Sequence, residues 1–250
     1  MKYHELSSPA LGQRAPHTPV VIPIAALEQH GDHMPLFTDS LLVAEVARRA
    51  EESLGDRVLF GPVMWFGNSE HHMDFPGTLS AAPRTYLNML NDMVENLLTH
   101  GFRRIVLLNG HGGNIVPSQQ AMFEVRQRHR ERDDLLLLST TYWTLGANVG
   151  DSHEWQQRQM GHAGEWETSM MLRIRPDLVG DHLACTTVPF GDFFPGSHRA
   201  WITKERTARG HIGSPQAATA EKGETLFATL SGDVIRLLEK VADWDGTAWE

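Results

Sequence analysis

The sequence predicts an α/β fold with three layers, in which a mainly parallel central sheet carries helices on both faces. Short apolar runs alternate along the chain with longer segments of helical periodicity, which is the pattern of strands joined by crossover helices. The first run, PVVIPIAA at residues 19–26, is continuously apolar, and such a run suits a strand buried on both faces. Because no internal repeat or linker interrupts the pattern, we expect a single domain over residues 1–250.

The first elements follow this alternation directly. After the strand over residues 19–26, apolar residues with helical spacing predict a helix over 38–53. Thr38 and Asp39 are the two candidates for its N-cap, since both side chains can accept a hydrogen bond from the first turn. The apolar stretch 57–65 (RVLFGPVMW) predicts the second strand.

The next helix is expected over residues 83–98, because Pro83 suits a first turn and Gly101 suits a helix stop. The run RIVLL at 104–108 is the clearest buried strand. The remaining expected elements are a helix over 115–130, a strand over 134–142, an irregular polar segment over 143–161, a helix over 165–174, a Gly- and Pro-rich segment over 181–213 and a closing helix over 215–241.

Composition excludes several classes of partner. The net charge of −9 and the absence of a basic cluster argue against nucleic acid, which is bound through grouped Lys and Arg. Cys185 is the only cysteine, so no intrachain disulfide can form and a reducing compartment fits best. Residues 1–16 lack the apolar core of a signal peptide, and no run is long enough to cross a membrane. We therefore expect a cytoplasmic protein without membrane partners.

A first cluster of candidate ligands follows the first strand. Glu28 and His30 are two residues apart, so in an extended chain their side chains project from the same side. Asp39 stands at the head of the next helix. Two carboxylates and an imidazole suit Zn, Mn or Fe(II). The plainer alternative is that Asp39 caps the helix and that Glu28 and His30 are polar loop residues.

A second cluster follows the strand over 104–108. His111 lies among glycines in Asn109–Asn114 (NGHGGN), where glycine permits a sharp turn and close approach of the backbone to a ligand. A glycine-rich turn with an incidental histidine is the alternative. The segment does not match the dinucleotide fingerprint, because Ile115 stands where a third glycine is needed.

A third cluster comprises His162, Glu165 and Glu167 at the start of the helix over 165–174. Carboxylates in a first helical turn are also favoured by the helix dipole, which would explain both glutamates without a ligand role. That alternative leaves His162 unexplained.

Several motifs together resemble the creatininase family across nearly the whole chain. They are residues 26–39 (ALEQHGDHMPLFTD), 75–78 (FPGT), 109–114 (NGHGGN), 162–169 (HAGEWETS) and 220–224 (AEKGE), in order and at compatible spacing. The resemblance implies a creatininase-like fold and an amidohydrolase that uses two divalent metal ions, Zn, Mn or Fe, to cleave a C–N bond other than an ordinary peptide bond.

The resemblance also implies a ligand set. Asp39 would bridge the two ions, Glu28 and His111 would bind one of them, and His30 would bind the other.

The sequence departs from creatininase at one ligand position, where Gly113 replaces a glutamate. We expect Glu167 to supply the missing carboxylate, with Glu165 as the alternative.

In the mechanism that the resemblance implies, a hydroxide held by the two ions attacks the amide carbon, and His162 acts as general acid–base. A Gly-x-Ser-x-Gly nucleophile motif is absent.

Substrate identity is less constrained. By resemblance Trp143 lines the pocket, although a core-packing role is equally compatible, and Arg158 stands where creatininase has a lid tryptophan. Arg158 would favour an anionic substrate, unless it is simply a solvent-exposed loop residue. Gly113 and Arg158 argue against creatinine itself, so we expect another small amide, a lactam or a formamide.

Two alternatives to this function are kept. One is a peptidase that acts on a short modified peptide, as in mycofactocin maturation, and the other is a non-catalytic small-molecule binding protein with the same fold. By resemblance to creatininase we also expect a homo-oligomer, namely a hexamer.

Overall fold

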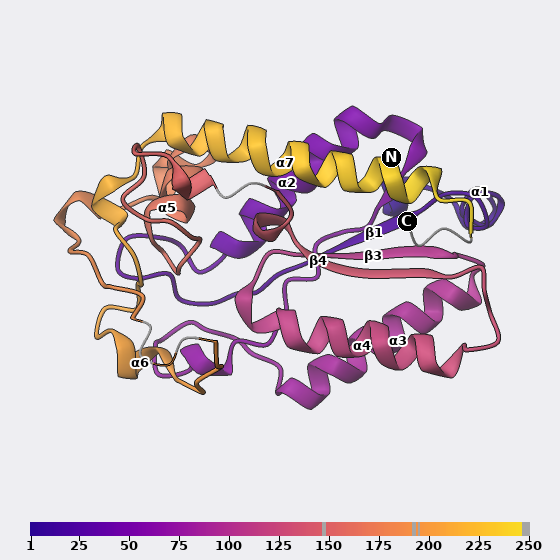
Figure 1. Ribbon diagram of the computed structural model, residues 1–250, viewed down its shortest axis with the longest axis horizontal. Helices are drawn as coiled ribbons and strands as arrows, with labels where there is room; N and C mark the ends of the chain where they lie inside the picture. The colour runs from indigo at the N-terminus through magenta and orange to yellow at the C-terminus, as the bar shows by residue number, and fades with distance from the viewer. Residues whose placement is uncertain (147–148, 192–193, 195, 247–250) are drawn as a thin grey trace.

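The computed structural model describes residues 1–146, 149–191, 194 and 196–246. Its centre is a four-stranded parallel sheet with the strand order β2-β1-β3-β4 (Figure 1). Val21 of β1 is paired with Phe60 of β2 and with Val106 of β3, and Val106 is paired with Leu138 of β4. The strands are β1 (Val20–Ile24), β2 (Leu59–Phe60), β3 (Arg104–Asn109) and β4 (Leu136–Thr141).

Helices cover both faces of the sheet, so the three-layer α/β prediction is confirmed (Figure 1). One face carries α2 (Thr38–Leu54), α5 (Glu165–Ile174) and α7 (Ala220–Asp243), and the other carries α3 (Pro83–Thr99) and α4 (Ile115–Arg128). Successive strand residues point to opposite faces. Val21 therefore packs in the core beneath α2, α5 and α7, while Val20 and Ile22 pack in the core beneath α3 and α4.

Several element boundaries differ from the prediction. The expected strand over 57–65 is only two residues long, because Arg57 ends a 3-10 turn and Gly61–Pro62 interrupts the ladder. The closing helix begins at Ala220 rather than at 215, since the side chain of Thr219 accepts from Lys222 N and fixes the helix start there.

The N-cap prediction for α2 was wrong. Phe37 occupies the cap position, and the Thr38 hydroxyl donates to the carbonyl of Pro35. Asp39 lies inside the first turn, and its carboxylate is directed to two histidines instead of the helix amides.

Two short helices were not predicted, α1 (Ser8–Arg14) and α6 (Thr203–Arg206). Both lie in segments whose polar composition gave no helical periodicity. Within the segments expected to be irregular, residues 147–148, 192–193 and 195 lie outside the described residues. None of the helices in the described part of the chain is long and apolar enough to cross a membrane.

The described residues also contain nine short 3-10 helices. They are Tyr3–Glu5, Gly55–Arg57, Glu70–His72, Gly112–Asn114, Tyr142–Thr144, Val149–Asp151, Pro176–Leu178, His182–Ala184 and Pro215–Ala217.

Candidate metal centre

Four segments bring buried acidic and histidine side chains together at the carboxyl edge of the sheet. Because β1 and β3 are adjacent and parallel, the chain leaves both at the same edge, which is where sites in such sheets lie. The segments are the loop after β1, the first turn of α2, the loop after β3 and the start of α5. Their site residues, each at most 8% exposed, are Glu28, His30, Asp39, His111, His162 and Glu167.

His30 is oriented by the backbone of its own loop. Its Nδ1 lies 3.1 Å from the carbonyl oxygen of Glu28, to which it can donate. Its Nε2 then faces two carboxylates, 3.0 Å from Oδ1 of Asp39 and 3.8 Å from Oε1 of Glu167. A histidine that donates one ring N–H to a backbone carbonyl and turns the other nitrogen to a cluster of acids has the usual arrangement of a metal ligand.

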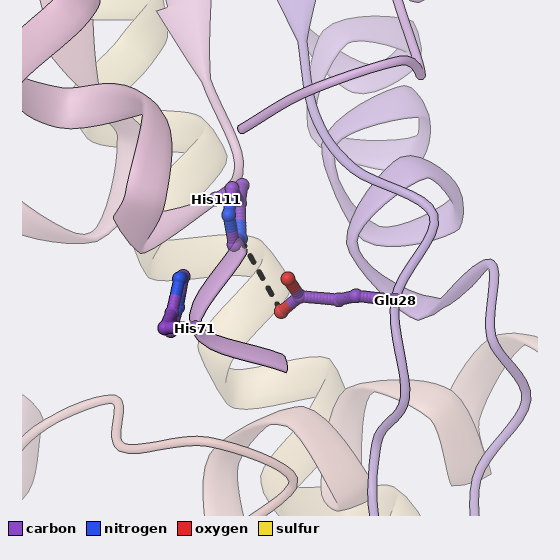
Figure 2. Close-up of side chains that lie close together, drawn as sticks. All are labelled: Glu28, His71 and His111. Atoms are coloured by element: carbon purple, nitrogen blue, oxygen red, sulfur yellow. Dashed lines mark ion pairs between the residues drawn. The ribbon is translucent and has the colours of Figure 1, made fainter. Parts of the chain in front are cut away.

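His111 repeats this arrangement from the other strand. Its Nε2 lies 2.9 Å from the carbonyl oxygen of Asn68, which accepts the N–H. Its Nδ1 lies 2.9 Å from Oδ2 of Asp39 and 3.3 Å from Oε1 of Glu28, and Figure 2 shows the approach of Glu28 to His111. Asp39 therefore stands between the two histidines, with one carboxylate oxygen directed to each.

The carboxylates need a cation at this point. Among the described residues, Oε2 of Glu28 and Oδ2 of Asp39 are buried and accept no hydrogen bond. With its proton on Nε2, His111 turns a lone pair on Nδ1 toward that Asp39 oxygen, so two lone pairs would face each other. A metal ion between them resolves this conflict, and the mixed N and O donors suit Zn, Mn or Fe.

Without an ion, protons would have to take that role. Burial opposes protonation of His30 and His111, but the adjacent carboxylates outweigh burial and raise the pKa of both imidazoles well above the ordinary value. The same histidines hold the pKa of Asp39 below its ordinary range despite its burial. The site is therefore electrostatically built to hold positive charge against buried carboxylates.

Glu165 and Glu167 have different surroundings. Oε1 of Glu165 is 2.5 Å from Nζ of Lys222, and its Oε2 accepts from the backbone N–H of Gln157 at 2.8 Å. Oε2 of Glu167 accepts from the N–H of Ala163 at 2.5 Å, and its Oε1 faces His30. Glu167 thus lies at the cluster, whereas Glu165 is engaged outside it.

His162 lies beside the carboxylates, in the loop that leads into α5. Its Nε2 donates to the carbonyl of Gln29 at 2.8 Å, and its Nδ1 lies 3.6 Å from Oε1 of Glu28. Its ring centroid is 4.4 Å from that of His30. Burial, followed by the charge of His30, lowers the pKa of His162 to about 3.

Sequence reasoning missed two histidines at the site, His71 and His72. Nε2 of His72 lies 3.4 Å from Oε1 of Glu28, and its Nδ1 is 2.7 Å from the side-chain Nε2 of Gln29, which can donate to it. This leaves the proton of His72 on Nε2, so the ring can donate toward Glu28. The ring of His71 stacks on His111, with 5.7 Å between the ring centroids (Figure 2). One of its nitrogens lies close enough to Glu28 and His111 to bind the same metal ion. The only signal was an adjacent histidine pair shortly before the FPGT motif.

The backbone geometry explains the glycine at position 113. A Cβ atom there would lie 2.1 Å from the carbonyl oxygen of Asn68, 2.5 Å from Nε2 of His111 and 2.9 Å from Cε1 of His71. The Asn68 carbonyl that orients His111 therefore occupies the position of a Cβ atom at residue 113, and only glycine fits there.

Trp143 and Arg158 are placed differently with respect to the site. Trp143 lines a cavity of about 520 Å³ that also borders Glu28, Asp39, His111, His162 and Glu167. It packs partly against the core as well, with its ring edge-on to Tyr142 at 4.9 Å. Arg158 is exposed and is not among the residues that line this cavity. This placement agrees with the alternative interpretation of Arg158 as a solvent-exposed loop residue.

A parallel α/β sheet with buried His, Asp and Glu donors converging at its carboxyl edge is the arrangement of a metal-dependent enzyme. Comparison with known proteins specifies the class. The family model "Creatininase: Creatinine amidohydrolase" matches residues 4–238. The chain therefore belongs to the creatininase family, and it is a metal-dependent amidohydrolase.

Individual relatives carry two different activities in their names. The chain is 33% identical to the mycofactocin precursor peptide peptidase of Mycolicibacterium smegmatis, over 84% of this chain and 80% of that protein. It is 32% identical to the creatinine amidohydrolase of Pseudomonas putida, over 83% and 84% respectively. A solved mutant creatininase described as the Zn–Zn type superposes with a TM-score of 0.82 at 27% identity, covering 97% of this chain and 98% of that one.

Proposed function

We propose that the protein hydrolyses a C–N bond of a small non-peptide or cyclic amide, such as a lactam or a formamide, with two divalent metal ions. The observation that carries this proposal is the position of Asp39, whose two carboxylate oxygens face His30 and His111 separately. Both histidines are held by backbone carbonyls so that their free nitrogens point at the carboxylates. The Zn–Zn description of the similar creatininase also supports two ions.

The donors divide into two groups around Asp39. Glu28 and His111 would hold one ion, while His30 and Glu167 would hold the other. When bound, two such ions would lower the pKa of a shared water to about 7 and polarise the amide carbonyl. Glu165 is not needed in this set, because its carboxylate is satisfied by Lys222 and the Gln157 backbone.

We assign proton transfer to His162. The carbonyl of Gln29 fixes the ring through Nε2, so Nδ1 is the nitrogen directed to the carboxylate cluster and the cavity. Because Nε2 keeps its own proton, Nδ1 offers a lone pair: it can accept the proton that the attacking water releases and then deliver that proton to the leaving nitrogen. Trp143 lines the same cavity and would contact the substrate.

A peptidase that acts on a short modified peptide is the second candidate. The identity to a mycofactocin precursor peptidase favours it, and so does the size of the cavity. The space of about 520 Å³ at the site shares Trp143, His162 and Trp201 with a neighbouring space of about 550 Å³. Such a hollow has room for more than a single small ring.

Metal quantification combined with a substrate screen tests the function. Metal-loaded protein should hydrolyse at least one lactam, formamide or short peptide, and a chelator should abolish the activity. His162→Ala should keep its metal but lose about 10²–10⁴-fold in turnover. Full activity in metal-free protein would contradict the mechanism, and loss of metal from the His162 variant would make this residue a ligand.

The identity of the ions, the location, the domain organisation and the oligomeric state are also proposed. We propose Zn, Mn or Fe as the ions, a cytoplasmic location, one domain and, from the family, a hexamer. Exposed apolar residues on α4, Val116 and Phe123, are 72% and 61% exposed and lie seven positions apart, on one side of the helix. They suit a contact between subunits, which light scattering would reveal as a mass above that of the 28.0 kDa chain.

A further inference from the structure

The cavity at the metal centre continues toward the segment that contains α6. The cavity of about 520 Å³ bordered by the metal-site carboxylates shares part of its lining with the adjoining cavity of about 550 Å³. Arg206 of α6 lines only the second of these. The two cavities therefore form one hollow, with the proposed metal ligands at one end and a guanidinium at the other. The shared lining residues are Gly112, Trp143, Met160, Gly161, His162 and Trp201.

Trp201 joins the two ends. Its ring stands edge-on to His71 at 5.2 Å, on the side of the metal centre. The guanidinium of Arg206 lies over the same ring, 5.1 Å from the centroid. The guanidinium and a histidine of the donor cluster therefore contact the same aromatic ring. A substrate held by both ends would be short.

The guanidinium has unused binding capacity. Arg206 donates to the carbonyl of Phe190 and stacks on Trp201, but it forms no ion pair with any carboxylate of the described residues. A guanidinium carries five N–H donors, so several remain. Glu205, its neighbour in the chain, accepts instead from the backbone N–H of Ile202 at 3.4 Å. Burial, and then the nearby Arg199, lowers the pKa of Arg206, as expected for a cation without a counterion.

We propose that Arg206 binds a carboxylate of the substrate, so that the protein acts on amides that carry an acid group a short distance from the scissile C–N bond. This inference rests on the proposed function and adds its substrate class. Arginine suits the role because its planar donors match a carboxylate in two hydrogen bonds. An N-acylamino acid and the carboxyl end of a short peptide present the same chemistry.

Arg206 replaces Arg158 as the basis for an anionic substrate. The sequence pointed to Arg158, but this side chain is exposed and lines neither of the two cavities. The charge pattern of the hollow also favours one orientation. The acidic end repels a free carboxylate until metal ions are bound, whereas the Arg206 end attracts it, so the amide is directed to the metal centre.

Calorimetric binding to the metal-loaded protein tests the inference without requiring turnover. N-acetylglycine should bind, and N-acetylglycinamide, which lacks the charge, should bind about 10–100-fold more weakly. Arg206→Gln should remove that preference, and Arg206→Lys should keep part of it. Arg209→Gln is the matched control, because Arg209 lies three residues away, is 64% exposed and lines neither cavity. The same comparison with a dipeptide and its amide shows which of the two sources fits the hollow.

The outcomes separate this inference from the proposed function. If the carboxylate preference depends on Arg206 but no amide is hydrolysed, the inference stands and the proposed function fails. If amides are hydrolysed but the acid and its amide are used equally, the inference fails and the function stands. A carboxylate affinity that falls with chelation but not in Arg206→Gln would place the carboxylate on the metal ions and overturn the inference.

Discussion

Two glutamates in the first turn of α5 take different tasks because of their angular spacing. Residues two apart on an α-helix point about 200° apart, so Glu165 and Glu167 cannot serve the same ion. Glu165 is fully buried and is neutralised by Lys222 at 2.5 Å. Glu167 faces His30 instead. A substitution of Glu165 can therefore serve as the control for the same substitution of Glu167.

Glu167→Gln should lower the occupancy of one metal ion, because an amide oxygen is a weaker ligand than a carboxylate. Glu165→Gln should leave metal content intact but destabilise the fold by about 1–3 kcal/mol, since the ammonium of Lys222 loses its buried partner. Elemental analysis and urea unfolding of both variants measure the two effects. Metal loss from the Glu165 variant alone would transfer the ligand role to Glu165.

Gly113 and Gly112 provide a second matched pair. In Gly113→Ala the new Cβ would meet the Asn68 carbonyl at 2.1 Å, and this carbonyl is the group that orients His111. We expect metal affinity to fall about 10–100-fold, as for other changes to groups that hold a ligand. Gly112→Ala should bind metal normally, because nothing lies within 4 Å of its Cβ position. Equal affinity in both variants, measured by competition with a chelator, would show that the Asn68 contact does not orient His111.

The site residues that directly follow a strand could be predicted from the sequence. Glu28, His30 and His111 come directly after apolar runs, so the sheet topology predicted that they meet. His71 and His72 lie in a loop without periodicity, and Trp201 lies in a Gly- and Pro-rich segment. The paths of such segments depend on tertiary packing, and their contribution to the site could not be predicted from the sequence.

At the scale of elements, α7 packs so closely on α5 that a glycine is required between them. A Cβ at Gly223 would lie 2.0 Å from the carbonyl oxygen of Ser169 in α5. Elsewhere in the same helix, Gly232 has only the flexible end of Arg236 nearby, at 3.4 Å. The carbonyl cannot move without displacing α5, the helix that begins with Glu165 and Glu167.

Gly223→Ala should therefore destabilise the protein by about 1–3 kcal/mol, as overpacking in a core does. Gly232→Ala should stabilise it by about 0.5–1 kcal/mol, because alanine has the higher helix propensity. Chemical denaturation of both variants measures the difference. A Gly223 variant as stable as the parent would mean that α5 and α7 can separate freely.

The order and type of the long elements were predictable, whereas their ends depended on local chemistry. Pro83 begins α3 and the positive φ of Gly101 follows its end, as the sequence indicated. The second strand lost most of its expected length to Gly61–Pro62. The helix α1 is short and has no fully buried residue, so no apolar periodicity marks it in the sequence.

At the scale of the whole molecule, the metal centre joins parts of the chain that are distant in sequence. Glu28 and His30 follow β1, Asp39 begins α2, His111 follows β3 and Glu167 belongs to α5. Ions bound by these side chains would connect the sheet to two helices on one face. Removing them would leave only protons on His30 and His111 to balance the buried carboxylates.

Metal removal should therefore lower the stability of the entire fold. A ligand present at 100 times its dissociation constant stabilises the native state by about 2.7 kcal/mol, which corresponds to roughly 5–10 °C in Tm for a chain of this size. Scanning calorimetry with and without a chelator measures this shift. Asp39→Ala should show little or none of it, because the carboxylate that faces both histidines is gone. A chelator-dependent shift of equal size in Asp39→Ala would mean that the ions bind without this carboxylate and that the Asp39 assignment is wrong.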